Sequence, residues 1–300
     1  MKVLITGASG MIGTALTKKL SGMGHECFAL VRREARDETE IAWDPATGTI
    51  DSPRLEGMDA VIHLAGANIA SKRWSDDYKQ VIRDSRVDGT QLLASALAGL
   101  QNPPSVFVST SAIGYYGDRG AEELTTTAAP ADDFLAQVCV DWERAADPAR
   151  ERGIRVVHPR IGVVLSSQGG ALPKMLFPFR MCLGGVVGSG KQYWSWIGLD
   201  DVVGAIIHMM ENDSLSGPVN CVSPNSVTNR EFTKTLGTVL NRPTIFPMPG
   251  FVVKTLFGEM GDALMLYSTR VVPEQLMNSG YQYANAELAD CLTEAARGRI

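Results

Sequence analysis

The chain has 300 residues, of which 45% are hydrophobic and 20% are charged, as in ordinary folded globular proteins. The formal net charge of −5 argues against nucleic acid as a partner. No apolar run of 18 residues is present, so we expect no membrane partner either.

The cysteines and the N-terminal segment exclude further classes of protein. Five cysteines are scattered without a CxxC spacing, which predicts reduced thiols and no metal site. The opening MKVLITGASG turns polar too soon for a secretory signal peptide. We therefore expect a cytoplasmic protein whose partner is a small molecule. The sequence does not indicate an oligomeric state.

The first predicted elements are a strand, a glycine-rich loop and a helix. Residues 2–6 form an apolar run typical of a buried parallel strand, and residues 14–20 favour a helix. Between them, Gly7 permits a tight turn, Gly10 admits a phosphate and Gly13 allows close packing of the helix on the strand. This order predicts a dinucleotide site with the pyrophosphate at the helix N-terminus.

The second predicted strand, residues 26–31, indicates which dinucleotide is bound. An acidic residue after this strand would favour NAD, whereas an arginine can accommodate the 2′-phosphate of NADP. The chain has Arg32 and Arg33 here, with Arg36 close by. We predict NADP as the cofactor, with Arg32 as the main contact. The alternative interpretation is a solvated basic loop.

The following elements alternate between strands and helices. Strands are predicted at residues 59–64, 105–109 and 154–158, and helices at 76–98 and 133–152. This alternation predicts an α/β Rossmann fold with a doubly wound parallel sheet. We assign residues 1–165 to an NADP-binding domain. Residues 166–300 are assigned to a smaller α+β region on the substrate side, partly interleaved with the first.

Several motifs together resemble the short-chain dehydrogenase/reductase superfamily, on its extended, epimerase-like side. The motifs are TGASGMIG, VIHLAG, VSTSAIGYYGD, WIGLDDVVGAI and GPVNCVSPNSVTNREF. The stretches RWSDDYKQVIRDSRVDGTQLL and RVVPEQLMNSGYQY resemble an atypical subfamily that ends in a small domain of unknown function. The resemblance spans residues 1 to about 292. It implies an oxidoreductase- or epimerase-like protein that binds NADP, and some relatives carry a cell-division label.

The resemblance also implies cofactor positions. Arg86 stands where extended members often keep an asparagine near the cofactor, and Val164 matches a segment near the nicotinamide. The full set of implied and predicted cofactor residues is Gly7, Ser9, Gly10, Met11, Ile12, Gly13, Arg32, Arg33, Leu64, Ala65, Gly66, Arg86 and Val164.

The catalytic motif of the superfamily is where this chain departs from the pattern. Hydride-transfer members use a Ser or Thr, a Tyr and a Lys, and the last two lie four residues apart on a helix. Ser111 matches the serine, with Thr110 beside it. When Glu143 is matched to the acid that often follows the motif, Leu135 and Cys139 occupy the Tyr and Lys positions. No register restores the pair.

Two tyrosines are the candidates to replace the missing acid. Tyr115 and Tyr116 follow Ser111 in the loop after the strand at 105–109, and either could donate a proton or only pack. The catalytic candidates are therefore Ser111, Thr110, Tyr116 and Tyr115. Two functions stay open: an NADP(H)-dependent oxidoreductase or epimerase acting on a nucleotide sugar or a carbonyl compound, and a non-catalytic NADP(H) sensor.

Overall fold

The computed structural model describes residues 1–298 and 300, and the chain separates into two compact units that alternate along the sequence. Unit 1 comprises Met1–Ser111, Val138–Pro159 and Ala205–Val219. Unit 2 comprises Ala112–Gln137, Arg160–Gly204 and Asn220–Ile300. The chain passes between the units several times. The sequence prediction placed a boundary after residue 165 and expected the two parts to be partly interleaved.

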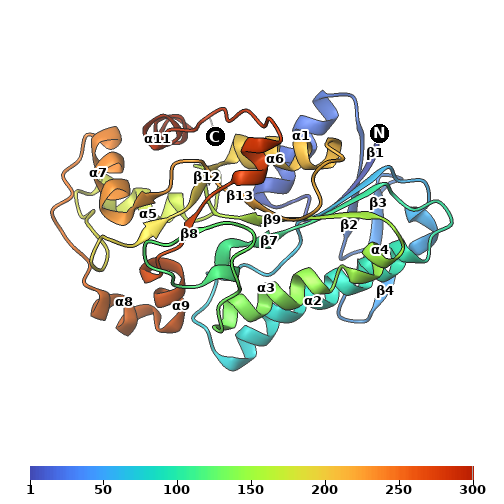
Figure 1. The fold of residues 1–300 in the computed structure, drawn as a ribbon, viewed down its shortest axis with the longest axis horizontal. Coiled ribbons are helices and arrows are strands. Elements are labelled where there is room, and N and C mark those ends of the chain that lie inside the picture. The colour runs from blue at the N-terminus through green and yellow to red at the C-terminus, as the bar shows by residue number, and fades with distance from the viewer. Residues whose placement is uncertain (299) are drawn as a thin grey trace. The chain divides into compact units, whose positions relative to one another are not determined.

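Unit 1 is organised around a mostly parallel sheet with the strand order β13-β9-β6-β5-β1-β2-β3-β4 (Figure 1). Strand β1 lies between β2 and β5 and is parallel to both, so the chain order reverses at β1. Ligands of open α/β sheets bind at such a reversal. The strands are β1 (Lys2–Thr6), β2 (Glu26–Val31), β3 (Glu40–Asp44), β4 (Thr49–Ile50), β5 (Ala60–His63), β6 (Val106–Ser109), β9 (Arg155–Ile161) and β13 (Gly217–Cys221).

This sheet confirms the predicted Rossmann-like α/β fold. The predicted strands at 2–6 and 26–31 agree with β1 and β2 residue for residue. Three strands of this order were not predicted: β3 pairs in parallel with β2, β4 pairs antiparallel with β3, and β13 lies beside β9.

Helices cover both faces of the sheet. Figure 1 shows α1 (Met11–Gly22) on one face and α2 (Asp76–Ala98) with α4 (Asp147–Glu151) on the other. Helix α2 begins after Ser75, whose hydroxyl accepts a hydrogen bond from the backbone N–H of Tyr78. The predicted helix at 133–152 consists of two helices, α3 (Phe134–Arg144) and α4. Helix α4 has a proline in its first turn, as is common where a helix starts.

The core of unit 1 fixes the sheet against α2. Leu4, Val61 and Phe107 come from three neighbouring strands and are fully buried with Leu93 and Leu97 of α2. Side chains that leave water in this way supply the main stabilisation of the fold. Because the strands are anchored along their length, their carboxyl ends form a fixed edge.

Unit 2 is built from helices and short strand pairs. Its pairs are β8 with β15, β10 with β12 and β11 with β14. Helix α7 begins with a reciprocal cap in which Thr228 and Glu231 bind each other's backbone N–H groups. The remaining elements of the chain are β7 (Ser111–Ala112), β8 (Glu123–Leu124), β10 (Val163–Leu165), α5 (Leu172–Arg180), β11 (Tyr193–Trp194), β12 (Trp196–Gly198), α6 (Leu199–Glu211), β14 (Val227–Thr228), α7 (Asn229–Leu240), α8 (Gly250–Phe257), α9 (Glu259–Gly261), β15 (Arg270–Val271), α10 (Glu274–Asn278) and α11 (Leu288–Ala296), with short turns of helix at Ser52–Leu55, Ile113–Tyr116 and Asp262–Leu266.

Two negative findings hold for the described residues. None of their helices combines the length and the apolar character that crossing a bilayer requires. The five cysteines have free thiols, and no group of three or more His, Cys, Asp or Glu side chains is placed to hold a metal ion.

Candidate functional site

The loop between β1 and α1 has the shape of an anion cradle. Gly7 has φ +67°, a conformation that side chains rarely adopt. A Cβ atom on Gly13 would lie only 2.2 Å from the carbonyl oxygen of Gly7, so glycine alone fits there. Gly10 is the N-cap of α1 and provides no side chain to cap the helix. The first backbone N–H groups of α1 are therefore available to an anion, with exposed Ser9 beside them.

A buried threonine joins this loop to the end of β5. The Thr6 hydroxyl oxygen accepts hydrogen bonds from the backbone N–H groups of Leu64 at 3.0 Å and Ala65 at 3.1 Å. It also lies 2.7 Å from Nδ1 of His63, whose pKa burial lowers to about 3. Gly7 packs directly on this segment, since a Cβ there would be 3.1 Å from the Ala65 nitrogen. The structure thus brings Gly7, Leu64 and Ala65 together, as the cofactor prediction requires.

The arginines after β2 have different environments. Arg33 Nη1 donates to Glu40 Oε2 at 2.6 Å, and this pairing, together with the backbone N–H of Arg36, lowers the Glu40 pKa to about 2. Arg32 is exposed and forms no hydrogen bond or ion pair with the residues that the structure describes. Of Arg32 and Arg33, Arg32 is therefore the one whose charge is available to a ligand.

Arg86 of α2 places a guanidinium beside the end of β5. A Cβ on Gly66 would lie 3.3 Å from the Arg86 Cζ atom, and the guanidinium lies 5.1 Å from the centre of the Trp142 ring. Its Nη1 donates to the carbonyl oxygen of Ile82 at 3.0 Å. Within residues 1–298 and 300, no carboxylate pairs with it, and burial lowers its pKa. A desolvated cation without an acidic partner is costly, so this position suits an anionic ligand.

Ser111 and Thr110 lie at the end of β6, with hydroxyls that point to different partners. The Thr110 hydroxyl donates to the carbonyl oxygen of His63 at 2.8 Å and so ties β6 to β5. The Ser111 hydroxyl donates to Oε1 of Glu143 on α3 at 2.7 Å. Both residues are buried. Ser111 is therefore the one hydroxyl of the two that is linked to an ionisable side chain.

Helix α3 carries the positions of the expected Tyr and Lys. Leu135, Cys139 and Glu143 are spaced by four residues and lie on one face of the helix. Cys139 is buried and lies close enough to Arg86 to influence its pKa. Sequence reasoning used Glu143 only to set the register and missed it as a partner of Ser111. It also missed Trp142 as a partner of Arg86.

The two tyrosines after Ser111 belong to unit 2 and are not equivalent. Tyr116 is fully buried, donates to Oδ1 of Asn220 at 2.6 Å and accepts from Nη1 of Arg160 at 3.0 Å. Tyr115 is only partly buried, and its ring lies 3.4 Å from the Arg160 guanidinium carbon. These contacts make Tyr116 part of the core of unit 2. The Tyr115 hydroxyl, in contrast, forms no hydrogen bond with the described part of the chain.

Val164 is the one predicted cofactor residue in unit 2. It lies in the middle of β10, paired with Ile197 of β12, and is partly exposed. The other twelve predicted cofactor residues, from Gly7 to Arg86, all belong to unit 1.

Two family models match the chain. The model described as the NAD dependent epimerase/dehydratase family matches residues 3–221. A model of a domain of unknown function, DUF1731, matches residues 248–295. Together they match the two parts that the sequence motifs indicated.

Curated relatives match nearly the whole chain. An epimerase family protein of Mycobacterium bovis is 41% identical over 290 residues, which cover 97% of this chain and 96% of the relative. The human epimerase family protein SDR39U1 is 37% identical over 297 residues, which cover 98% and 99% of the two chains.

Solved structures agree with these matches. A crystal structure of human SDR39U1 with NADPH has a TM-score of 0.90 and 36% identity, and the match covers 99% of both chains. A nucleoside-diphosphate sugar epimerase from Corynebacterium glutamicum has a TM-score of 0.81 and 36% identity, over 98% of this chain and 58% of that one. MoeE5 in complex with UDP-glucose and NAD, at 22% identity and a TM-score of 0.77, shares the fold.

Proposed function

The chain belongs to the NAD dependent epimerase/dehydratase family, and on this premise we propose that it is an NADP(H)-dependent oxidoreductase or epimerase of a small molecule. The observation that carries the enzymatic part of the proposal is the hydrogen bond between Ser111 and Glu143. It supplies a hydroxyl linked to a carboxylate where the superfamily uses a serine with a tyrosine and a lysine.

The loop at β1 and α1 fits a dinucleotide. Close approach of Gly13 to Gly7 leaves the N-terminus of α1 uncovered for a pyrophosphate. Ser9, Met11 and Ile12 extend this contact. The solved SDR39U1 complex with NADPH supports the choice of cofactor, because that protein matches this chain over 99% of its length.

The arginines after β2 favour NADPH over NADH. Arg32 would bind the 2′-phosphate, because its side chain is exposed and has no acidic partner in the described chain. Arg33 contributes less, since its guanidinium is held by Glu40. Arg32 would thus bind the ligand, while Arg33 would order the loop.

Arg86 would supply the positive charge that a lysine supplies in related enzymes. Its guanidinium lies over Trp142 and next to Cys139, the residue at the lysine position. It also contacts Gly66, which follows the segment that packs on Gly7. A cation at this point is suited to hold the nicotinamide half of the cofactor through its oxygen atoms.

The Ser111–Glu143 pair would then handle the proton of the reaction. When bound, the nicotinamide supplies or accepts the hydride. The Ser111 oxygen can accept a hydrogen bond from a substrate hydroxyl because its own proton is donated to Glu143. As the substrate hydroxyl becomes a carbonyl, its proton passes to Ser111 while the serine proton passes to Glu143, and the reverse steps operate in reduction. Leu135 and Cys139 take no part in this transfer.

Thr110 and the tyrosines have supporting roles in this proposal. Thr110 holds the end of β6 through His63, and Tyr116 holds the core of unit 2. Tyr115 is the tyrosine whose hydroxyl forms no hydrogen bond with the described part of the chain, so of the two it stays the candidate acid. A nucleotide sugar or a small carbonyl compound is the expected substrate class, and the name of the Corynebacterium relative supports the first.

The decisive experiment is turnover with matched variants. Purified protein is incubated with NADPH or NADP and a panel of nucleotide sugars and carbonyl compounds. We expect Ser111→Ala and Glu143→Gln each to lower the turnover rate by about 100-fold, as loss of a proton-transfer group does. Ser105→Ala is the control, because that hydroxyl binds a backbone carbonyl near the opposite end of β6. Full activity in both site variants would refute the assigned pair.

A second function is favoured by the apolar face of α3. Leu135 cannot transfer a proton and buried Cys139 cannot supply an ammonium charge, so under this alternative the chain binds NADP(H) only to sense it. Under this alternative, NADPH binds tightly, no compound of the panel turns over, and Ser111→Ala changes nothing measurable. Binding of NADPH alone does not separate the two functions.

A further inference from the structure

Unit 2 exposes a group of large hydrophobic side chains. Three of them are more than two thirds exposed: Phe177 and Phe251 at 72% and Ile245 at 70%. We define the apolar patch as these residues and their exposed neighbours: Phe177, Met181, Leu183, Ile245, Phe246, Phe251 and Leu256. Soluble proteins seldom leave so many large apolar side chains uncovered within one region.

Backbone contacts bring the two segments of the patch together. The N–H of Phe246 donates to the carbonyl oxygen of Gly184 at 3.3 Å, and that of Met248 donates to Val186 at 2.9 Å. The loop after α5 therefore runs beside the loop before α8. The apolar side chains of α5, the two loops and α8 form one region of unit 2, not scattered single residues.

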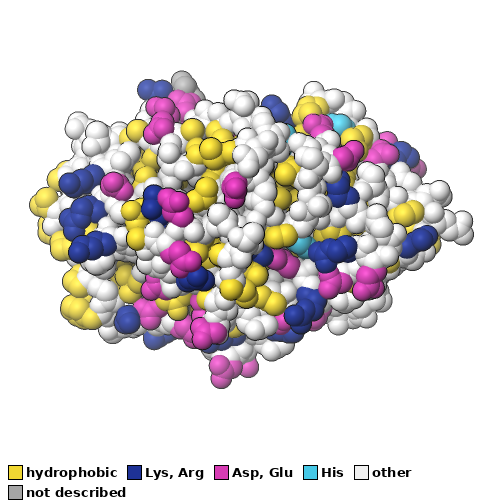
Figure 2. All heavy atoms as spheres, in the orientation of Figure 1, with side chains coloured by type: hydrophobic (Ala, Val, Ile, Leu, Met, Phe, Trp, Pro, Cys, Tyr) yellow, Lys and Arg dark blue, Asp and Glu magenta, His cyan; other side chains and the backbone are white. Residues whose placement is uncertain are grey.

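Basic residues outnumber acidic residues around the patch. Residues 172–191 and 232–258 contain no Asp or Glu, although the whole chain has 33 acidic residues. Lys174 and Arg180 lie three residues before and after Phe177, and Arg242 lies three before Ile245. Lys254 adds less, because Asp262 lies 3.7 Å from it. Figure 2 shows basic and hydrophobic side chains together at the end of the molecule that holds α7 and α8.

We propose that the apolar patch and its cations dock this protein on the surface of an anionic lipid bilayer. Phe177, Ile245 and Phe251 would enter the boundary between headgroups and acyl chains, while Arg180 and Arg242 would bind the lipid phosphates. The expectation of no membrane partner came from the absence of a spanning segment. Attachment to one leaflet requires no such segment.

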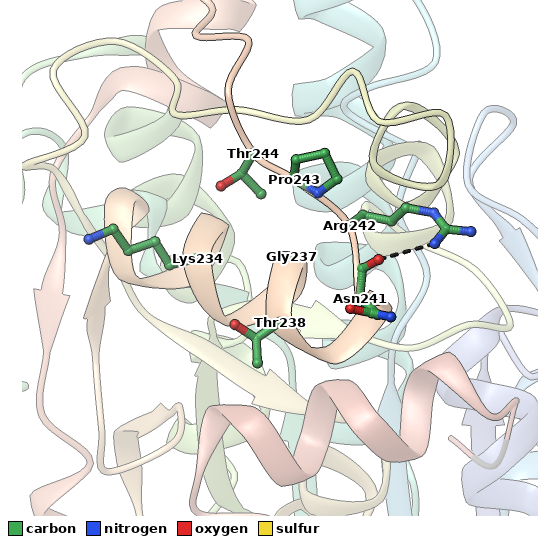
Figure 3. Close-up of a pocket in the computed structure, with 7 residues that line it drawn as sticks. All are labelled: Lys234, Gly237, Thr238, Asn241, Arg242, Pro243 and Thr244. Carbon is green, nitrogen blue, oxygen red and sulfur yellow. Dashed lines mark hydrogen bonds between the residues drawn. The ribbon is translucent and has the colours of Figure 1, made fainter.

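Two other occupants fit the region less well. A second copy of the chain would bring the same cations face to face, and like charges oppose such an interface. A protein partner usually places an anchor side chain in an apolar pocket. The hollow that the structure shows in this part of the chain, drawn in Figure 3, is lined by Lys234, Gly237, Thr238, Asn241, Arg242, Pro243 and Thr244. Most of these side chains are polar, and none belongs to the apolar patch.

The test is binding of the full chain to lipid vesicles. Phosphatidylcholine vesicles with and without phosphatidylglycerol are sedimented with the protein. We expect binding only to the anionic vesicles, weakened by raised salt. Replacing Phe177 and Phe251 by serine should reduce the bound fraction by at least about tenfold, because two large apolar groups no longer enter the bilayer. Arg180→Gln with Arg242→Gln should reduce it by about threefold to tenfold.

Matched controls separate docking from general effects. Met277→Ser removes another half-exposed hydrophobic side chain of unit 2, and Lys18→Glu changes a basic residue of α1. Neither should change vesicle binding. A tryptophan introduced by Phe251→Trp should show a blue-shifted emission with anionic vesicles alone. All substitutions are at exposed positions, and equal melting temperatures verify that the variants fold.

Three results would overturn the proposal. Failure to bind anionic vesicles would refute it directly, as would equal binding to neutral vesicles. A dimer in light scattering that the two phenylalanine substitutions dissociate would assign the patch to a second copy instead. None of these results bears on NADPH binding or on turnover.

Discussion

The phosphate loop and helix α3 differ in how closely each follows the pattern that the sequence resemblance implies. In the loop, Gly7 and Gly13 are fixed by backbone contacts that no other residue type fits. On α3, Leu135 and Cys139 stand at positions where related enzymes carry a proton donor and a cation. We propose that Arg86, Ser111 and Glu143 supply the charge and the proton-transfer groups instead.

The largest expected effect comes from breaking the loop. In Gly13→Ala, a Cβ at 2.2 Å from the Gly7 oxygen must displace backbone, so we expect a loss of about 3 kcal/mol in the free energy of unfolding. NADPH affinity should fall by about 100-fold or more, since charge-assisted contacts of the α1 N–H groups are lost. Gly22→Ala is the control, because a Cβ there meets nothing within 4 Å. Thermal melts and NADPH fluorescence titration measure the two effects. Unchanged affinity in Gly13→Ala would contradict the cradle.

The second prediction tests whether Arg86 supplies the positive charge that a lysine supplies in related enzymes. Arg86→Gln removes a cation that has no acidic partner in the described chain, so NADPH affinity should fall by about 10-fold to 100-fold. Affinity for 2′,5′-ADP, which lacks the nicotinamide half, should stay nearly constant. The matched control is Arg83→Gln, one turn earlier on α2, where the arginine pairs with Asp141.

A rescue variant sharpens this test. In the Arg86→Gln background, Cys139→Lys places an ammonium at the superfamily's own position, and it should restore part of the lost NADPH affinity. If both nucleotides weaken equally in Arg86→Gln, the arginine has only a structural role at the end of β5.

A smaller effect is expected at the 2′-phosphate. Arg32→Ala should weaken NADPH binding by about tenfold and leave NADH binding nearly unchanged, because the exposed pair is partly screened by solvent. Arg33→Ala should change the NADPH preference much less, since Arg33 is held by Glu40. Titration of the two variants with both nucleotides provides the comparison. Equal losses for NADPH and NADH in Arg32→Ala would remove the basis for NADP specificity.

The sequence predicted what is local and missed what depends on tertiary packing. The strands at 2–6 and 26–31 and the helix at 76–98 follow from continuous apolar or periodic runs, and the glycine loop is contiguous, so each was read correctly. Strand β3 lacks the continuous buried run of β1 and is fixed by its pairing with β2, a contact that no local pattern reveals. The approach of Arg86 to Trp142, and of Ser111 to Glu143, likewise depends on the packing of α3. No spacing within either segment signals these pairs.

The last expected effect concerns the support beneath the loop and depends on pH. The Thr6 oxygen accepts two backbone N–H groups, so its own proton goes to Nδ1 of His63. Burial lowers the His63 pKa from 6.5 to about 3, so between these values the unfolded chain binds a proton that the folded chain does not. The free energy of unfolding should therefore fall as pH drops below 6.5, by up to about 1.4 kcal/mol per pH unit from this residue. His63→Asn keeps an acceptor for Thr6 but does not titrate, so its unfolding free energy should depend less steeply on pH between 6 and 4. Denaturant melts of both proteins measure the difference. Identical slopes would mean that His63 titrates alike in the folded and unfolded chains, and that the Thr6 contact does not hold it neutral.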